Sequence, residues 1–360
     1  MNQSPPSIWP GLALTFVVAA VARWVHAWPF APFTIDGRHP VDALLLAIVA
    51  GVAIRNLVGM SPTLAPGIKY SVKRLLPIAI VLLGAKLDFL KIVEISRQGL
   101  VVSLVCVTVA IALTLALCRR LGVGQKLAIL ISVGTAICGG TAIVVSAPAI
   151  EAEDHDVAFA VTTITLFGLG AIFLFPLLGA ALQMSEMSFG IWAGVSIQAT
   201  PQVMAAGFAY GPLAGEVAVI VKLVRVLLLA PIVVILGAWY TRQKRARGEV
   251  HVARRTPLRA LVPPFIVGFL LLAVANSLNL LPDFTLHLKQ SFLWSAGDHD
   301  IALASAVTKV SGFLITMSMA GVGLGVDIST LRRVGLSALY AGLIAAVILA
   351  AFGLAMIQLL

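Results

Sequence analysis

The chain has 360 residues, of which 60% are hydrophobic and only 11% are charged, and its mean hydropathy is +1.04. No class of soluble globular protein has this composition, so the lipid bilayer is the expected solvent. The formal net charge of +10 does not indicate a nucleic-acid partner, because the basic residues lie in short segments between apolar runs rather than along one face.

Windows of about twenty residues locate eleven apolar segments, each long enough to cross the bilayer as a helix. The N-terminal MNQSPPSIWP lacks the basic region of a signal peptide, so the first segment is expected to be retained as a span. The predicted fold class is an all-α polytopic membrane protein with about 11 transmembrane helices in a single domain over residues 1–360. The segments lie near 11–28, 41–59, 72–90, 98–118, 125–150, 157–183, 188–208, 212–240, 259–279, 301–326 and 335–358.

Lysines and arginines concentrate in four of the even-numbered connections, which predicts the orientation. They follow the second, fourth, eighth and tenth segments, whereas the connection after the fifth carries the acidic cluster 151–156. Cytoplasmic connections carry the excess of basic residues, so the N-terminus is expected in the cytoplasm and the C-terminus outside it. The basic stretch 242–259 is interpreted as a topology signal rather than a binding site.

Two pairs of residue matches indicate an internal repeat. Asn56 recurs as Asn276 at an offset of 220, and Gly84 recurs as Gly323 at an offset of 239. The repeat halves are then 41–118 and 259–358, around a central region 125–240, and an odd number of crossings between them makes them inverted. Under this scheme, the two interrupted segments of the central region, which are described next, are not related to each other by the inverted repeat.

The first interrupted segment is GTAICGGTAI at 134–143, which holds three glycines and two threonines inside a long apolar run. Glycine weakens a helix by about 1 kcal/mol relative to alanine, and a break within hydrocarbon is tolerated only where protein or water satisfies the freed backbone groups. We therefore expect a discontinuous helix that lines a polar cavity. The alternative is close packing of helices through small residues.

The second interrupted segment is GVSIQATPQV at 194–203. Pro201 removes a backbone donor, and two glutamines enter an otherwise apolar run. Paired interrupted helices are typical of the binding site of a transporter, and helix packing alone explains these polar residues less well.

Lys222 and Arg225 lie three residues apart in the eighth apolar segment and therefore on one helix face. Ionisable groups within the membrane are costly, and no acid lies at the same depth in that segment, so a bound anion is one candidate partner. An acid from another helix, or snorkelling of the side chains to the interface, is the alternative.

Enzyme signatures are absent, so no catalytic residue is expected. The sequence contains no GxxxxGK[ST], HExxH or GxSxG motif. Cys106, Cys118 and Cys138 lack the spacing of a metal site, so neither a metal nor another cofactor is expected.

The motifs ICGGTAIVVSAPAIEAE, TLFGLGAIFLFPLL, GVSIQATPQVMAAG and AVIVKLVRVLLLAP occur in this order. From about residue 40 to the C-terminus the chain resembles the sulfate exporter (YeiH-like) family of bacterial membrane proteins. The resemblance implies a secondary transporter of the inner membrane, with inverted repeats and crossed broken helices, that carries sulfate or a related sulfur-containing anion. Where the family commonly has His and an acid, this chain has Gln198 and Ala199, whereas Gln202, Lys222 and Arg225 match.

The sequence thus predicts a carrier that moves a small anion by alternating access, coupled to Na+ or H+. A passive anion channel and a membrane-embedded sensor or structural subunit remain alternatives. The expected partners are the anion and the lipid bilayer, with a homodimer left open and no nucleic acid. The expected substrate-binding residues are Thr135, Cys138, Gly139, Gly140, Thr141, Ser196, Gln198, Thr200, Gln202, Lys222 and Arg225.

Overall fold

The computed structural model describes residues 7–28, 42–87, 89–246, 263–281, 283–288, 297–327 and 336–358. Within these ranges the regular structure is helical, apart from one antiparallel pair of strands, β1 (Asp283–Leu288) and β2 (Gly297–Ala302). The helices pack into two compact units, which are described separately. Unit 1 comprises residues 1–94 and 264–326, and unit 2 comprises 95–263 and 327–360.

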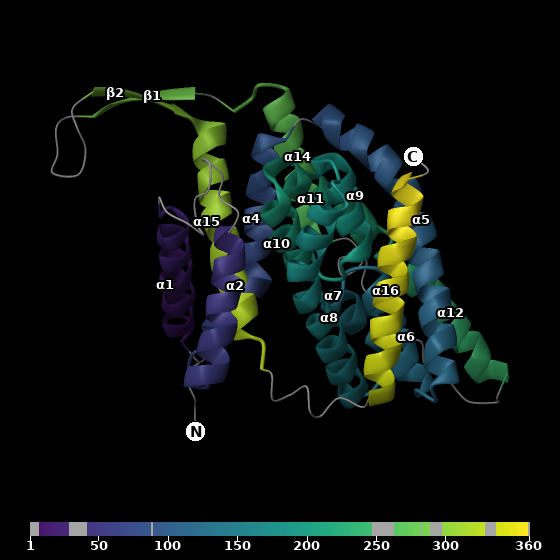
Figure 1. The fold of residues 1–360 in the computed structure, drawn as a ribbon. Helices are drawn as coiled ribbons and strands as arrows, with labels where there is room; N and C mark the ends of the chain where they lie inside the picture. Colours follow the sequence, from purple (N-terminus) through teal and green to yellow (C-terminus); the bar gives the residue numbers. More distant parts are fainter. Residues whose placement is uncertain are drawn as a thin grey trace. The chain divides into compact units, whose positions relative to one another are not determined.

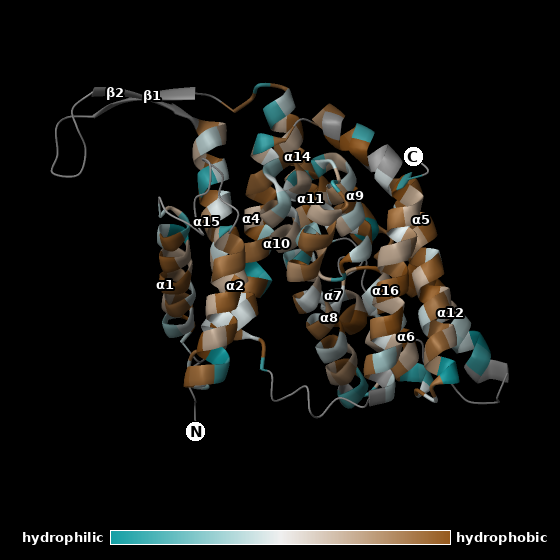
Figure 2. Cartoon of the chain, in the orientation of Figure 1, coloured by the Kyte–Doolittle hydropathy of each residue, from teal (hydrophilic) through white to brown (hydrophobic). Residues whose placement is uncertain are grey.

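Six helices in the described ranges are long and apolar enough to cross a membrane. Four apolar helices are shorter, and two of these, Gln125–Ala136 and Gly140–Ile150, come from one segment predicted to cross. Hydrophobic residues dominate the helices, whereas hydrophilic ones gather near the ends of α8 and α12 (Figure 2). A multi-pass membrane protein is therefore supported. The six long helices are Trp9–His26, Ile92–Arg120, His155–Ala181, Pro212–Gln243, Leu303–Leu324 and Leu339–Gln358.

Unit 1 is built on direct contact between helix backbones. A Cβ atom placed on Gly323 would lie 2.2 Å from the Ile48 carbonyl oxygen, and one on Gly51 would lie 2.6 Å from the Ala320 carbonyl oxygen. Only glycine permits α2 and α15 to approach so closely. The elements of this unit are α1 (Trp9–His26), α2 (Ala43–Ala53), α3 (Ala65–Tyr70), α4 (Leu76–Leu83), the start of α5 (Phe89–Arg120), α14 (Pro264–Ser277), β1, β2 and α15 (Leu303–Leu324).

Two asparagines at helix ends in unit 1 make matching contacts. Asn56 Nδ2 donates a hydrogen bond to the Val326 carbonyl oxygen at 2.9 Å, and Asn276 Nδ2 donates one to the Leu87 carbonyl oxygen at 3.3 Å. Each asparagine therefore satisfies a carbonyl at the end of another helix. Asp88, which the sequence pairs with Asp327 by the same offset as Gly84 with Gly323, lies outside the described residues.

Unit 2 contains the remainder of α5 and the region predicted to hold the site. Its elements are α6 (Gln125–Ala136), α7 (Gly140–Ser146), a 3-10 turn (Ala147–Ile150), α8 (Asp154–Ala181), α9 (Glu186–Ser196), α10 (Thr200–Tyr210), α11 (Pro212–Leu227), α12 (Leu229–Ala246) and α16 (Leu336–Gln358). Figure 1 shows α6 and α7 toward one end of α8, with α9 and α10 toward the other.

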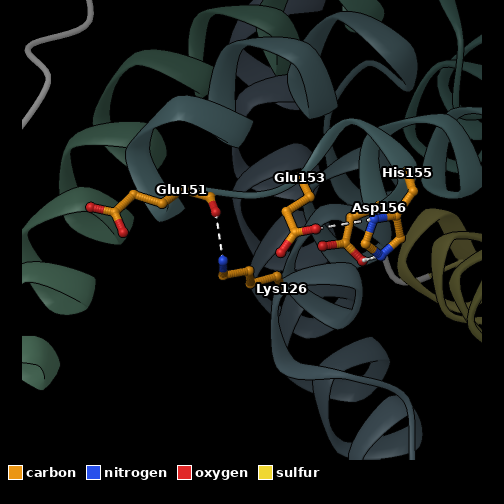
Figure 3. Close-up of polar contacts among 5 residues, drawn as sticks. All are labelled: Lys126, Glu151, Glu153, His155 and Asp156. Carbon is orange, nitrogen blue, oxygen red and sulfur yellow. Dashed lines mark hydrogen bonds and ion pairs between the residues drawn. The ribbon is translucent and has the colours of Figure 1, made fainter.

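Residues 125–150 form a helical hairpin rather than a crossing. Lys126 Nζ donates a hydrogen bond to the Glu151 carbonyl oxygen at 2.6 Å (Figure 3), whereas a straight helix would separate these residues by about 38 Å. The first hairpin, α6 with α7 and the 3-10 turn, thus begins and ends at the same place. The acidic cluster that begins at Glu151 consequently lies beside basic Lys126, and its predicted position on the opposite side is wrong.

Residues 186–210 form a second hairpin in place of the predicted crossing near 188–208. Tyr210 Oη, at the end of α10, donates to the Met184 carbonyl oxygen just before α9, and the rings of Tyr210 and Phe189 stack with centroids 3.9 Å apart. Glu186 Oε2 accepts hydrogen bonds from the Leu213 and Ala214 amides, so α11 also begins at this open end.

The two hairpins enter unit 2 from opposite ends. α8, with 28 residues, is about 42 Å long and connects the open end of the first hairpin to the open end of the second. α6 and α9, with 12 and 11 residues, reach about 18 and 16 Å inward. That is about half the thickness of a 30 Å hydrocarbon layer.

Candidate functional site

The tips of the two hairpins meet where the sequence predicted broken helices. Helical structure stops between Ala136 and Gly140 in the first hairpin, and between Ser196 and Thr200 in the second. Gly139 adopts a φ of +69°, and a Cβ on it would lie 3.3 Å from the Ala199 Cβ. The breaks therefore turn the chain back on itself and bring the predicted residues of both segments together.

We expect Gly139→Ala to lower the stability of unit 2 by about 1–2 kcal/mol, because an L-residue in the left-handed region is strained. The melting temperature of the purified protein should fall by about 3–6 °C. Gly170→Ala in α8 is the control, since a Cβ there meets nothing within 4 Å and its melting temperature should not fall. A Gly139→Ala variant that melts with the wild type would contradict the strained tip.

Arg225 holds both hairpins by their inner helix ends. Its guanidinium is fully buried. Nε and Nη2 donate to carbonyl oxygens at the end of α6, and Nη1 donates to those at the end of α9. A helix leaves its last four carbonyl groups without partners, and the C-terminal partial charge favours a cation. Arg225 therefore serves as a clamp between the tips. The acceptors are Thr135 (3.0 Å), Ala136 (3.0 Å from Nε), Gly194 (3.1 Å), Val195 and Ile197 (3.4 Å).

Lys222 is also fully buried, and it has fewer contacts. Its Nζ donates to the Ile197 carbonyl oxygen at 2.8 Å, in the turn of the second hairpin. Neither Lys222 nor Arg225 forms an ion pair with a described carboxylate. Protein carbonyls are thus the observed partners of both side chains, whereas the sequence-based hypothesis offered a bound anion as one candidate partner. An anion would be attracted by their charge without contacting Arg225.

Gln202 fastens the second hairpin to α8. Its Oε1 accepts from the Ala199 amide at 3.2 Å, and its Nε2 donates to the Thr165 carbonyl oxygen at 3.1 Å. A Cβ on Gly168 would lie 1.6 Å from Gln202 Oε1, so glycine in α8 makes room for this side chain. Both polar groups of the Gln202 side chain thus have partners within the protein, and the TLFGLG motif that contains Gly168 is the signal that could have predicted its position.

Three of the predicted residues carry buried oxygen atoms without hydrogen-bond partners among the described residues: Thr135 Oγ1, Ser196 Oγ and Gln198 Oε1. Buried polar groups are normally paired, so unpaired ones point to a missing partner such as water or a ligand. Ser196 and Gln198 also line a cavity of about 470 Å³ between α8, α9 and α16, whose other walls are apolar.

The remaining predicted residues divide by exposure. Cys138 and Gly139 are buried, Gly140 and Thr200 are half-buried, and Thr141 is exposed. Thr141 is the second residue of α7 and Thr200 is the first of α10, so both lie at the inward ends of these helices. The sequence-based site therefore separates into a buried clamp and an accessible edge.

Comparison with known proteins agrees with this membrane architecture. The family model described as Conserved hypothetical protein 698 matches residues 10–342. A UPF0324 membrane protein of Bradyrhizobium diazoefficiens is 35% identical over 328 residues, which are 91% of this chain and 86% of the relative. One from Agrobacterium fabrum is 36% identical over 349 residues (96% and 92%), and one from Bacillus cereus is 31% identical over 343 residues (95% and 89%). The chain therefore belongs to the Conserved hypothetical protein 698 family of UPF0324 membrane proteins.

Proposed function

We propose that this protein is a secondary active transporter that moves a small anion, sulfate or a related sulfur-containing anion, by alternating access. The observation that carries the proposal is the meeting of two half-depth hairpins, entering from opposite ends, beside two buried cations. Irregular backbone at membrane depth lies where it is buried in protein or lines a cavity, and interrupted helices of this kind form the midplane sites of transporters.

The charge at the tips favours an anion. Lys222 and Arg225 carry two formal positive charges, whereas the C-terminal ends of α6 and α9 each contribute about half a negative charge. When Lys222 is protonated, about one positive charge remains uncompensated, and the N-terminal end of α10 adds to it. We place the anion at the accessible edge formed by Thr141 and Thr200, within reach of this field.

Alternating access needs two related halves, and the contacts of the asparagines support them. Asn56 and Asn276 are 220 residues apart, and their acceptors Leu87 and Val326 are 239 residues apart, as in the sequence matches. Because the hairpins do not cross, only α8 separates the first hairpin from the second, which makes the hairpins inverted mates. In the sequence-based scheme an even number of steps separated the two interrupted segments, which excluded an inverted pair. With both segments as hairpins, a single crossing separates them and this obstacle is removed.

The repeat order that we infer is circularly permuted. One copy runs α2, α4, α5, first hairpin and α8, whereas the other begins with the second hairpin, α11 and α12 and continues with α14, α15 and α16. Leu354 and Ile357 near the end of α16 pack against the same hydrophobic cluster as Met184 and Tyr210 at the open end of the second hairpin. A permuted chain could therefore lead from α16 into that hairpin, as α5 leads into the first.

The proposed location is the bacterial inner membrane. Replacing two of the predicted crossings by hairpins leaves the number of crossings odd, so the N-terminus stays cytoplasmic and the C-terminus periplasmic. The open end of the first hairpin and the basic end of α12 then face the cytoplasm. Most of the basic stretch 242–259 lies outside the described residues.

Counterflow in reconstituted vesicles tests the function. Vesicles preloaded with unlabelled sulfate or methanesulfonate should transiently accumulate the labelled anion above equilibrium if the protein is a carrier. A passive anion channel would only equilibrate the label, and a sensor or structural subunit would not admit it. Imposed Na+ and H+ gradients, applied separately, identify the coupling ion. Failure to accumulate any anion of the panel contradicts the proposal.

Thr141→Val and Thr200→Val should each lower the initial rate of counterflow by about tenfold. Each variant removes one hydrogen bond to a charged ligand, worth about 1.5–3 kcal/mol, and 1.4 kcal/mol corresponds to a factor of ten. Thr108→Val in α5 is the matched control, because its hydroxyl is exposed and donates to Leu104 of its own helix at 2.8 Å. Unchanged rates in both tip variants would remove the accessible edge from the site.

A further inference from the structure

A pocket of about 390 Å³ lies in unit 2 at the end of α5, away from the hairpin tips. Its walls come from the last turn of α5, the first turns of α6 and the end of α12. The polar lining residues are Arg119, Gln125 and Gln243, and Gln125 Nε2 donates to Gln243 Oε1 at 3.0 Å. Leu115 and Trp239 provide apolar surface beside them.

The pocket is electropositive. Arg119 is exposed and has no hydrogen bond or ion pair with any described residue, and no carboxylate lines the pocket. α6 begins here, and its N-cap residue, Gly124, provides no side-chain acceptor for the first amides. Those amides and the N-terminal partial charge of α6 therefore add to the charge of Arg119.

The pocket lies where two of the candidate membrane spans end. The span Ile92–Arg120 ends one residue beyond Arg119, and the span Pro212–Gln243 ends at a lining residue. Trp239, which is 38% exposed, is of the type that settles at the boundary between hydrocarbon and headgroups. A ligand here would have its charge among the lipid headgroups and its apolar part along Leu115 and Trp239.

We propose that this pocket binds the phosphate of an anionic bilayer lipid, with phosphatidylglycerol as the test case. Arg119 pairs with the phosphate, the free amides of α6 donate to it, and the glutamine pair contacts the glycerol. The apolar side of the pocket favours a lipid over free phosphate, and basic pockets between membrane helices suit anionic headgroups. Neither the transport proposal nor its anion site is needed for this inference.

Binding of short-chain phosphatidylglycerol to the purified, delipidated full-length protein tests the proposal. By calorimetry it should bind at least about tenfold more tightly than short-chain phosphatidylcholine, because a charged hydrogen bond of about 1.5–3 kcal/mol amounts to about tenfold or more. Arg119→Gln should abolish this preference, and Arg119→Lys should restore part of it.

The matched control is Arg120→Gln, since Arg120 is exposed in the same turn but does not line the pocket. It should retain the phosphatidylglycerol affinity within about twofold, and equal melting temperatures should show that all variants fold. Equal losses of phosphatidylglycerol affinity in Arg119→Gln and Arg120→Gln would overturn the proposed binding site. So would a preference for phosphatidylglycerol over phosphatidylcholine that survives in Arg119→Gln. Inorganic phosphate that displaces the lipid at equal concentration would overturn the lipid as its ligand.

Discussion

Arg225→Ala is expected to prevent the stable folding of unit 2. The variant leaves the carbonyl groups of Thr135, Ala136, Gly194 and Val195 without the Arg225 donor, while Ile197 keeps its bond from Lys222, and each orphaned group costs about 1–3 kcal/mol. Even if water satisfies some of them, we expect the free energy of unfolding to fall by more than about 4 kcal/mol. This is a large part of the usual 5–15 kcal/mol for a native protein. The variant should show little monodisperse protein in size-exclusion chromatography, or melt at least about 10 °C lower.

Two further variants separate geometry from charge. Arg225→Lys keeps the positive charge but cannot span both helix ends, because an ammonium group lacks the planar fork of a guanidinium, so its melting temperature should be intermediate. Lys222→Met removes one hydrogen bond and should be tolerated better than Arg225→Ala. If Arg225→Ala melts within about 2 °C of the wild type, the clamp does not hold the tips.

Gly323→Val is expected to force α2 and α15 apart in unit 1. The new side chain would begin 2.2 Å from the Ile48 carbonyl oxygen, and backbone cannot move aside as a side-chain end can. Overpacking typically costs 1–3 kcal/mol, and we expect a loss of about 3 kcal/mol because Gly51 faces the same contact. The melting temperature should fall by about 6–12 °C.

Gly312→Ala is the control, since it lies in the same helix, α15, and the nearest atom to its new Cβ is 3.7 Å away. Alanine is the better helix former by about 1 kcal/mol, so this variant should melt at or above the wild-type temperature. Equal melting temperatures for Gly323→Val and the wild type would contradict the backbone contact.

Local chemistry explains why the interruptions could be predicted from the sequence. Glycines at 139 and 140 and the proline at 201 weaken a helix wherever they occur, so the two breaks were located to within a few residues. The reversal of the chain at each break depends on contacts between distant residues, such as Lys126 with Glu151. Two half-depth helices in sequence also have the length and hydropathy of one crossing, so an apolar window cannot distinguish them.

The role of the two cations was only half predicted. The cost of burying Lys222 and Arg225 indicated that each needs a partner that offsets its charge. Their partners are carbonyl oxygens, which every residue has, so nothing in the composition identifies them. A break in a helix creates unpaired carbonyls at one end, and this rule, applied to both breaks, would have suggested the clamp.

The way the second hairpin is fastened restricts how this protein can move. Tyr210 and Glu186 hold its base, Gln202 ties its inner turn to α8, and Arg225 secures its apex. Because the second hairpin is held at both its open end and its tip, it cannot move away from its neighbours in unit 2 without breaking several of these hydrogen bonds. We therefore expect unit 2 to keep its internal geometry, and spin labels placed within it should keep constant separations when the proposed anion is added.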